Sequence, residues 1–458
     1  MRSWVRRIGV GAAVLLLGGL APAVHAELTP PLGLPIPPLA TDTKSIGTLD
    51  KRHPVLTFAG ALDNPTPLPL VHSPVPVVCA VTCQSFSFTV TRARLFLVSV
   101  KDTAGSTSNG WDLSVYDPSG ALAGAANGIG ANGQAIAVTP TRTGTYTAFV
   151  TFTYAYDTGA KYNGEVRMMS GSSWQSGLVD CGLTVSGVRG CFRLPVLVAD
   201  PAFDFHVGGL PPVASTPLGF PIPVTVPTAT SCYVDETVQT GATRCLRFTS
   251  NVRNAGAARL DIRIPWLTTG PTSGFLPGQC QAEQAVQRTD GKVVMRPAGG
   301  CMFHPAHAHF HYKDLVGFSL HPLGANGAIG ARLGTGLKES FCLADDDYFG
   351  FGHAAANGPN TYDGQPGCNL PASITSSSVI VEEGVSPGWG DVYTWDTPGQ
   401  FIDISATPPG RYVLVERTNP SNTILVSGAP QLCSATELAL TADAVTITRS
   451  RPSITCPP

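Results

Sequence analysis

The chain has 458 residues, a formal net charge of −2 and a sequence pI near 6.5. Only 13% of the residues are charged, so the chain offers no basic face for nucleic acid and no sign of binding to an anionic membrane surface. The 50 glycines and 40 prolines favour short strands and turns over helices, and the length favours two domains.

Residues 1–26 have the pattern of a secretory signal peptide. Arginines precede an apolar run over residues 8–21, and small residues suit cleavage before Glu27. The Arg6-Arg7 pair weakly resembles a twin-arginine signal, but general secretion fits its surroundings better. No later stretch is long and apolar enough to span a bilayer. We therefore expect a soluble protein that is secreted to the extracellular side.

The twelve cysteines of this exported chain imply disulfides rather than thiolate chemistry. They can form six pairs, and pairing of sequential neighbours would close a short loop each time. Connectivity does not follow from sequence alone. In the local scheme Cys342 pairs with Cys368, and a loop of that length gains about 3 kcal/mol from closure.

A proline-rich stretch over residues 27–53 predicts an extended linker. Residues 54–170 then show the alternation of strands, with Phe86, Phe88 and Val90 separated by polar residues. Residues 144–154 place aromatic and aliphatic side chains on one face. The pattern predicts an antiparallel β-sandwich, and it resembles the prepeptidase C-terminal family of secreted accessory domains. No catalytic set of residues is found there, which favours a spacer or adhesion module.

A Gly/Ser-rich joint within residues 171–193 predicts a second linker, and residues 194–458 are expected to form the second domain. This domain contains His304-Pro-Ala-His307-Ala-His309-Phe-His311, which gathers four of the ten histidines into eight positions. In an extended strand His307, His309 and His311 project from one side.

Three imidazoles on one face predict a metal site. An all-nitrogen ligand set suits copper, zinc, nickel or iron and disfavours hard cations. His304 is a candidate fourth ligand or a hydrogen-bonding partner of one. The alternative is a solvated histidine-rich strand without function, but the apolar residues on its other face favour the metal site.

Several phrases of the second domain, taken in order, are similar to those of the lysyl oxidase family. The likeness spans about Leu194 to Ser427 and rests on four phrases and the histidine stretch between them. These phrases are LPVLVADP (194–201), CLRFTSNVRNAG (245–256), GLKESFCL (336–343) and GVSPGWGDVY (384–393).

The resemblance implies a role for each matching residue. His307, His309 and His311 match the copper ligands of that family. Lys338 and Tyr393 match the two residues that join to form lysine tyrosylquinone. Asp391 matches the acidic residue that is the candidate base, and in an extended strand it would share a face with Tyr393.

The same residue types suit this chemistry. A phenol near an oxidisable metal can become a quinone, and an unprotonated amine can add to it. The quinone carbonyl would then capture a substrate primary amine, a carboxylate would remove its α-proton, and water would release an aldehyde. Dioxygen would restore the quinone, releasing hydrogen peroxide and ammonia. The leading prediction is thus a secreted, copper-dependent amine oxidase similar to protein-lysine 6-oxidase, with peptidyl lysine or a small primary amine and dioxygen as its substrates.

The interval between Lys338 and Tyr393 is longer than is usual in the family, and residues 345–383 hold an insertion rich in Gly, Asn and Ser. Its first residues, Asp345, Asp346 and Asp347, offer oxygen ligands for calcium, although a solvated acidic loop is the favoured interpretation. Without the family resemblance, Lys338 would be explained as a surface charge on a strand. Tyr393, which lies beside tryptophans in the sequence, would be explained as a packing residue.

Two other functions remain open from the sequence. A non-catalytic copper-binding extracellular module would keep the histidine site while Lys338 and Tyr393 never react. A zinc hydrolase on the same strand is the third, although no HExxH phrase occurs. The fold expected in every case is all-β, with an antiparallel β-sandwich followed by a lysyl oxidase-like β-rich catalytic domain that has long loops and few helices.

Overall fold

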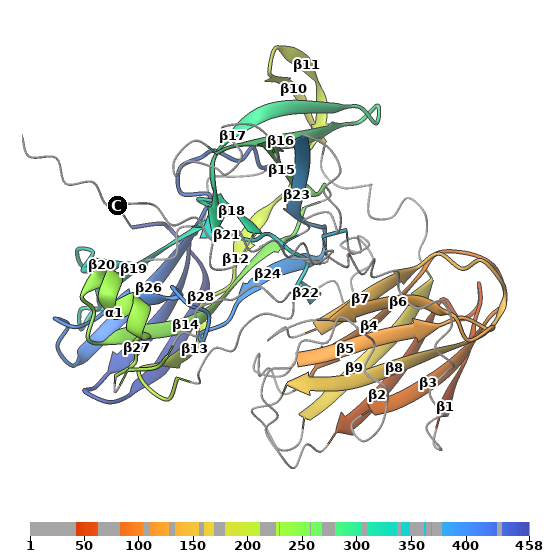
Figure 1. Ribbon diagram of the computed structural model, residues 1–458, viewed down its shortest axis with the longest axis horizontal. Coiled ribbons are helices and arrows are strands. Elements are labelled where there is room, and N and C mark those ends of the chain that lie inside the picture. The colour runs from red at the N-terminus through yellow and green to blue at the C-terminus, as the bar shows by residue number, and fades with distance from the viewer. Residues whose placement is uncertain are drawn as a thin grey trace, which may run out of the picture. The chain divides into compact units, whose positions relative to one another are not determined.

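Figure 1 shows the chain in a computed structural model. Residues 1–26, which were predicted to be a signal peptide, and most of the proline-rich stretch lie outside the residues that the structure describes. The described residues are 43–62, 83–103, 110–127, 133–154, 160–168, 179–210, 226–228, 230–256, 258–267, 280–304, 309–336, 340–348, 361–362, 368, 378–427 and 433–457.

The N-terminal part of the described chain is a β-sandwich of two sheets, with strand orders β1-β3-β8-β5-β6 and β2-β9-β4-β7. The strands of the first sheet are β1 (Lys44–Leu49), β3 (Cys83–Val90), β8 (Gly144–Tyr154), β5 (Gly110–Tyr116) and β6 (Leu122–Asn127). Those of the second sheet are β2 (Val55–Leu62), β9 (Ala160–Met168), β4 (Phe96–Asp102) and β7 (Gly133–Val138).

The core of the sandwich lies between these sheets and follows the predicted alternation. Phe86, Phe88 and Val90 of β3 are each 1% exposed, and Trp111 of β5 is fully buried. Aromatic rings meet edge to face within this core, as Phe88 does with Phe96 at a centroid distance of 5.5 Å. The predicted sandwich is confirmed.

Two stretches predicted as linkers contain strands instead. Strand β1 falls within residues 27–53 and pairs parallel to β3, so the sandwich is not wholly antiparallel. Strands β10 (Val179–Val185) and β11 (Val188–Arg193) form a hairpin within residues 171–193. Leu49 is buried in the core, and the Cys181–Cys191 disulfide crosslinks the hairpin. These contacts explain why stretches poor in strand-like alternation are nevertheless ordered.

The C-terminal part contains three further sheets. The eight-stranded sheet has the order β10-β11-β16-β17-β18-β21, with β15 and β23 attached through β16. Its other strands are β15 (Leu260–Leu267), β16 (Gln281–Arg288), β17 (Val293–His304), β18 (His309–Lys313), β21 (Ser340–Phe341) and β23 (Ser378–Val385).

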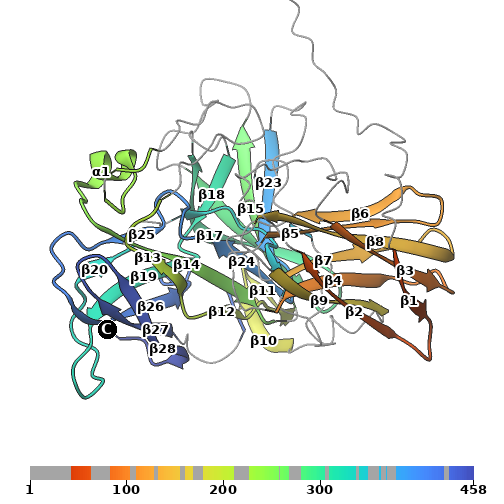
Figure 2. The ribbon, with the colours of Figure 1, turned by 90° about the horizontal axis from the view of Figure 1, so that it is seen from below.

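The five-stranded sheet has the order β20-β19-β26-β27-β28. Its strands are β20 (Gly334–Thr335), β19 (Val316–Pro322), β26 (Gly410–Thr418), β27 (Cys433–Leu440) and β28 (Val445–Ile454). Strands β26, β27 and β28 lie side by side in Figures 1 and 2. Strand β26 has a continuous buried run from Tyr412 to Glu416, as expected for a strand covered on both faces.

Strand β14 (Cys245–Asn254) is the centre of the remaining, six-stranded sheet. It pairs with β12 (Leu197–Ala199), β13 (Phe203–His206), β24 (Trp389–Tyr393) and β25 (Phe401–Asp403), and β24 in turn pairs with β22 (Asp347–Tyr348). Nine of its ten residues are buried. Because β14 holds β24 on one side, it fixes the strand on which Asp391 and Tyr393 stand.

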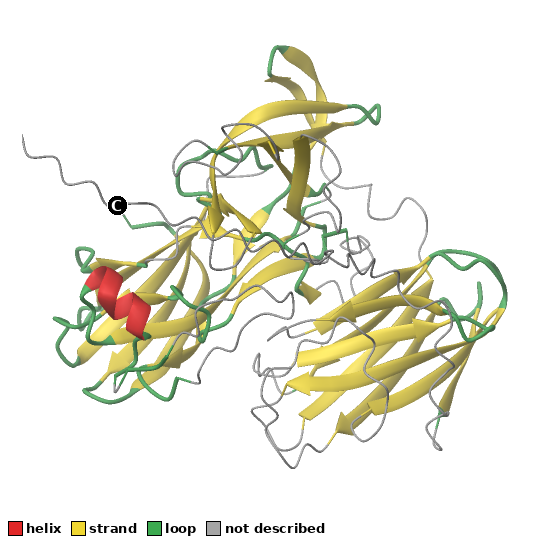
Figure 3. Cartoon of the chain, viewed as in Figure 1, coloured by secondary structure: helices red, strands yellow, loops and turns green. Residues whose placement is uncertain are grey.

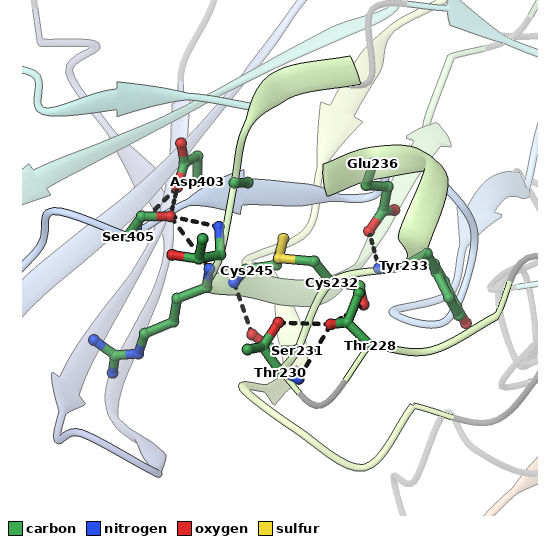
Figure 4. Close-up of a disulfide and its surroundings, with 12 residues drawn as sticks. Thr228, Thr230, Ser231, Cys232, Tyr233, Glu236, Cys245, Asp403 and Ser405 are labelled. Atoms are coloured by element: carbon green, nitrogen blue, oxygen red, sulfur yellow. Dashed lines mark hydrogen bonds between the residues drawn. A yellow bond between two sulfur atoms is a disulfide. The ribbon is translucent and has the colours of Figure 1, made fainter. Parts of the chain in front are cut away.

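Helix α1 (Val234–Thr240) is the one α-helix among the described residues, and Figure 3 shows it in red beside the yellow strands. Its N-terminus is capped by Glu236, whose carboxylate accepts the N–H of Tyr233 at 2.8 Å. The Cys232–Cys245 disulfide links the start of the helix to β14, and Ser231 Oγ accepts the N–H of Cys245 at 2.7 Å (Figure 4).

Arg247 of β14 completes this attachment. Its guanidinium pairs with Glu236 at 2.7 Å and donates to the carbonyl oxygens of Trp395 and Thr397, each at 2.6 Å. Arg247 is fully buried, and its guanidinium finds all of these hydrogen-bond acceptors inside the protein. The guanidinium therefore holds the turn that directly follows Tyr393.

Candidate functional site

The histidine stretch lies in a hairpin of strands β17 and β18. Antiparallel pairing sets His304 opposite His309 and Met302 opposite His311. His311 is buried, at 3% exposed. Residues 305–308, and with them His307, lie outside the described residues, as do the side chains of His304 and His309. The expected extended strand is present from His309 onward.

Strand β18 also pairs with β21, which follows the candidate lysine in the sequence. Tyr312 lies opposite Phe341, and Lys313 lies opposite Ser340. Lys338 stands two positions before Ser340 and is outside the described residues. The pairing brings the segment that directly follows Lys338 beside the strand that carries His311.

Tyr393 at the end of β24 contacts the same segment. Its hydroxyl donates to the carbonyl oxygen of Cys342 at 2.7 Å, and its ring meets Phe341 edge to face at a centroid distance of 5.0 Å. Burial raises the pKa of Tyr393 well above its usual value, and nearby carboxyl groups act in the same direction. The phenol is therefore neutral and keeps its proton as a hydrogen-bond donor.

Asp391 stands two positions before Tyr393 and is 1% exposed. Alternation along β24 sets Asp391 and Tyr393 on the same side of the strand. The N–H of Ala344 donates to Asp391 Oδ1 at 3.3 Å. The segment that carries Cys342 is thus hydrogen-bonded to both side chains, which ties the candidate base and the phenol to one stretch of backbone.

The interpretation of Asp345, Asp346 and Asp347 as a solvated acidic loop is wrong. Asp345 and Asp347 are each 4% exposed. Asp345 accepts backbone N–H groups from three residues, Thr361 and Tyr362 on Oδ2 and Ser386 on Oδ1, at 2.6–3.0 Å. Burial raises the pKa of Asp345 to about 6. These donors explain how a run of carboxylates is accommodated inside the protein.

Glu383 of β23 is a further buried carboxyl group of the site. It is fully buried, and its Oε2 accepts the N–H of Leu343 at 3.3 Å. Burial raises the pKa of Glu383 well above its usual value. The sequence interpretation missed Glu383 and the Asp345–Asp347 run as site residues. The available signal was their position in the sequence. The aspartates directly follow the apolar Phe-Cys-Leu-Ala stretch, and Glu383 directly precedes Gly384.

The disulfide between Cys342 and Cys368 is present as predicted. Pairing of sequential neighbours also holds for Cys181–Cys191, Cys232–Cys245, Cys280–Cys301 and Cys433–Cys456. Cys83 is disulfide-bonded as well, while Cys79 lies outside the described residues. The Cys342–Cys368 bridge crosslinks the residue whose carbonyl oxygen holds Tyr393.

Within the part of the chain that the structure describes, no three His, Cys, Asp or Glu side chains are grouped as a metal site. Two of the three expected copper ligands have side chains outside that part, so the histidine site stays a prediction.

Comparison with known proteins bears on the same residues. The family model for lysyl oxidase matches residues 288–449, a span that contains β18, Lys338 and β24. Residues 288–449 carry a lysyl oxidase domain. Lysyl oxidase homolog 1 of Homo sapiens is 28% identical over 199 residues, which cover 43% of this chain and 25% of the relative. The Bos taurus protein of the same name is 28% identical and 24% covered.

The chain therefore spans about a quarter of the length of these curated relatives. Among solved structures, the pre-peptidase C-terminal domain of a collagenase from Bacillus anthracis is similar at 18% identity. That likeness covers 28% of this chain and 95% of the other, with a TM-score of 0.18. The evidence for the sandwich is therefore its own strand pairing, and the sandwich lies outside residues 288–449.

Proposed function

We propose that the protein is a secreted, copper- and lysine tyrosylquinone-dependent amine oxidase that converts primary amines to aldehydes with release of hydrogen peroxide and ammonia. Peptidyl lysine and small amines are its substrate classes, with dioxygen as the second substrate. One observation carries the proposal. The Tyr393 hydroxyl donates a hydrogen bond to the carbonyl oxygen of Cys342. Cys342 belongs to the segment that follows Lys338, and Phe341 of this segment pairs with the histidine strand.

The residues present fit the two groups that this function requires. His311 is buried in β18, and His304 stands opposite His309, so the hairpin supports a nitrogen-ligand site that would include His307, His309 and His311. Lys338 and Tyr393 would supply the quinone. When bound, copper supports oxidation of the phenol, and the quinone supplies the carbonyl that takes up the amine.

The chain's own residues would prepare this chemistry in three ways. The Cys342 carbonyl orients the Tyr393 phenol toward the Lys338 segment. The packed Phe341 ring restricts the tilt of the phenol ring. Asp391 lies on the same side of β24 as the phenol and is nearly free of solvent contact, so its carboxylate can take a proton from a substrate held at Tyr393.

Secretion is supported by the disulfides. Disulfides persist in oxidising compartments and are rare in the cytosol. The signal peptide pattern of residues 1–26 agrees with this compartment. Over the described residues, no helix has the length and apolar character needed to cross a membrane.

Peptide mapping of copper-loaded, air-exposed protein tests the proposal. We expect a covalent Lys338–Tyr393 crosslink, visible absorbance, and stoichiometric reaction with a phenylhydrazine reagent that stops amine-dependent peroxide release. Lys338→Ala and Tyr393→Phe should each bind copper and lose turnover.

Tyr412→Phe is the matched control. The Tyr412 hydroxyl also donates to a backbone carbonyl, that of Pro408 at 2.7 Å, and the residue stands on β26. Its loss should leave the crosslink and turnover in place. If the protein binds copper but forms no crosslink, and releases no peroxide with any of a broad set of primary amines, it is a copper-binding module and not an enzyme.

A further inference from the structure

We propose that Gln400 belongs to the site, and that its side-chain carbonyl oxygen accepts a hydrogen bond from an amine nitrogen that reacts at Tyr393. Two amines have this chemistry, the side chain of Lys338 while the cofactor forms and the substrate amine during turnover. The inference rests on the proposed amine oxidase function and adds a residue to it. It also has tests that need neither copper nor turnover.

Strand β14 places the Gln400 amide beside Tyr393. Ser250 stands opposite Tyr393 in the pairing of β14 with β24. Side chains that stand opposite each other in an antiparallel pair share a face, with their Cβ atoms about 4.5–5.5 Å apart. Gln400 Nε2 donates to Ser250 Oγ at 3.1 Å. The amide is therefore anchored on the residue that neighbours the phenol across the two strands.

Gln400 also borders the segment that leads to Lys338. Gly336 and Ile402 form an isolated antiparallel bridge. Gly336 stands two positions before Lys338, and Ile402 stands two positions after Gln400. Lys338 itself lies outside the described residues. The bridge nevertheless brings the approach to Lys338 beside the strand that directly follows Gln400.

One end of the Gln400 amide is buried without a partner. Gln400 is fully buried, and its Oε1 accepts no hydrogen bond from any of the described residues. A carbonyl oxygen in this state costs free energy, because water has been removed and nothing replaces its hydrogen bond. The large majority of buried side-chain polar atoms do have a partner. An orphaned acceptor beside a reactive phenol points to a donor that arrives with the chemistry.

The turn between Tyr393 and Gln400 holds the amide in place. The N–H of Gln400 donates to the carbonyl oxygen of Thr397 at 3.1 Å. The buried guanidinium of Arg247 donates to the same oxygen and to the carbonyl oxygen of Trp395, each at 2.6 Å. These bonds fix the backbone on which the amide stands. The acceptor is therefore preorganised before any amine arrives.

A neutral amide oxygen suits an amine that has to react as a nucleophile. The N–H groups of amines are donors that a carbonyl oxygen accepts. A carboxylate in the same position would favour the ammonium form, because an opposite charge nearby raises the pKa of an amine. The ammonium form has no lone pair with which to attack a carbonyl carbon. Gln400 can therefore orient the amine without a negative charge that would keep it protonated.

The stability of two matched variants separates a role in the site from a structural one. Gln284 of β16 is also buried, but Leu425 bonds both ends of its amide and Arg296 donates to its Oε1. Gln284→Met should therefore lower the thermal midpoint of the copper-free protein by about 2 °C or more. Gln400→Met removes an orphaned acceptor and should leave the midpoint unchanged or raise it. A similar loss in both variants would mean that Gln400 is structural only, and would overturn the proposal.

Gln400→Met also tests the reaction itself. In copper-loaded, air-exposed protein, either the Lys338–Tyr393 crosslink should form about 10-fold more slowly or the KM for n-butylamine should rise about 10-fold, because a hydrogen bond to the amine is lost. Slower crosslinking with a native KM assigns the bond to Lys338. A raised KM with native crosslinking assigns it to the substrate amine. A native crosslinking rate together with a native KM would contradict the proposal.

Gln400→Glu distinguishes the two ends of the amide. A carboxylate keeps an acceptor, loses the N–H donor to Ser250 and adds a negative charge. We expect n-butylamine to bind at least as tightly as in the native protein while kcat falls, because the carboxylate favours the ammonium form. If Gln400→Glu loses amine binding as Gln400→Met does, the free end of the amide is a donor and the assignment of Oε1 as the acceptor is wrong.

Calorimetric titration of copper-free protein separates this proposal from the proposed function. In Lys338→Ala protein no lysine side chain competes for Gln400 Oε1, so n-butylamine should bind there, and adding Gln400→Met should abolish this binding. Equal binding by the two proteins, or no binding by either, would overturn the proposal. If binding behaves as expected but the copper-loaded native protein releases no peroxide, the amine-binding role of Gln400 stands and the amine oxidase function fails.

Discussion

The sandwich and the lysyl oxidase part keep their interiors together in different ways. The sandwich core is built from aromatic and aliphatic side chains such as Phe86, Phe88 and Trp111. The sandwich also buries two carboxyl groups, those of Asp102 and Glu165, but the C-terminal part buries more ionisable side chains: the Arg247–Glu236 pair, Asp345, Asp347, Glu383, Asp391 and Glu416. Apolar packing tolerates local change, whereas a buried charge needs its partner, so the two regions should respond differently to substitution.

The largest difference should come from breaking an ion pair in each region. Arg247→Ala leaves the Glu236 carboxylate buried without its partner, and should lower the free energy of unfolding by about 3–5 kcal/mol. Arg142→Ala removes a pair with Asp117 in which the arginine is 55% exposed, and should cost within about 1 kcal/mol. Urea unfolding of both variants measures this.

The double variant Arg247→Ala/Glu236→Ala should recover part of the lost stability, because no unpaired carboxylate remains. Similar costs for Arg247→Ala and Arg142→Ala would contradict the contrast between the two regions.

An added methyl group should have the next largest effect. In Gly384→Ala the new Cβ would meet the backbone carbonyl oxygen of Leu260 and the Tyr362 ring, whereas in Gly164→Ala it would meet the Phe58 ring alone. Overpacking costs about 1–3 kcal/mol, and a backbone carbonyl cannot move aside as a ring can. Gly384→Ala should therefore be the more destabilising change by thermal unfolding, and the reverse order would show that the sandwich is the stiffer core.

The smallest effect is a pH dependence of opposite sign in the two regions. Burial raises the pKa of Asp200 and of Asp345 to about 6 each, above the usual value near 3.9. Their contribution to stability is fully present below about pH 4 and is lost as the pH rises through about 6. In the sandwich, burial raises the pKa of Asp117, but hydrogen bonds from Ser119 and Ala121 outweigh burial, and the pKa is lowered. The contribution of Asp117 to stability is therefore lost as the pH falls.

Limited proteolysis with peptide identification, from pH 4.5 to 7.5, follows each region separately. Cleavage within β22–β24 should become faster as the pH rises, while cleavage within β5 and β6 should not. An equal response of the two regions would mean that these buried carboxyl groups do not distinguish them.

The sandwich could be predicted from sequence because alternation reports which face of a strand is buried, as Phe86, Phe88 and Val90 illustrate. The local disulfides followed from cysteine spacing and compartment, and the histidine strand from its own alternation. Tyr393 and Asp391 were found only through phrases shared with a family.

Other features depend on contacts between distant residues and leave no local pattern. Asp345 is buried because Thr361, Tyr362 and Ser386 supply its N–H donors, and no spacing rule predicts that arrangement. Strand β1 was hidden by proline-rich surroundings, since its order comes from pairing with β3. The hydrogen bond from Tyr393 to Cys342 likewise joins two elements that only the folded chain brings together.

The central position of β14 also determines when each region can fold. Its residue Arg247 is bonded to Trp395, 148 positions further along the chain, and its first residues pair with β25. Such non-local pairing folds slowly, because a long loop must close before any contact rewards it. The sandwich has all of its strands by Met168 and can fold while the rest of the chain is still emerging. The C-terminal part must wait until β24 and β25 have been made, so its hydrophobic strands stay exposed longest and most need protection from aggregation during folding.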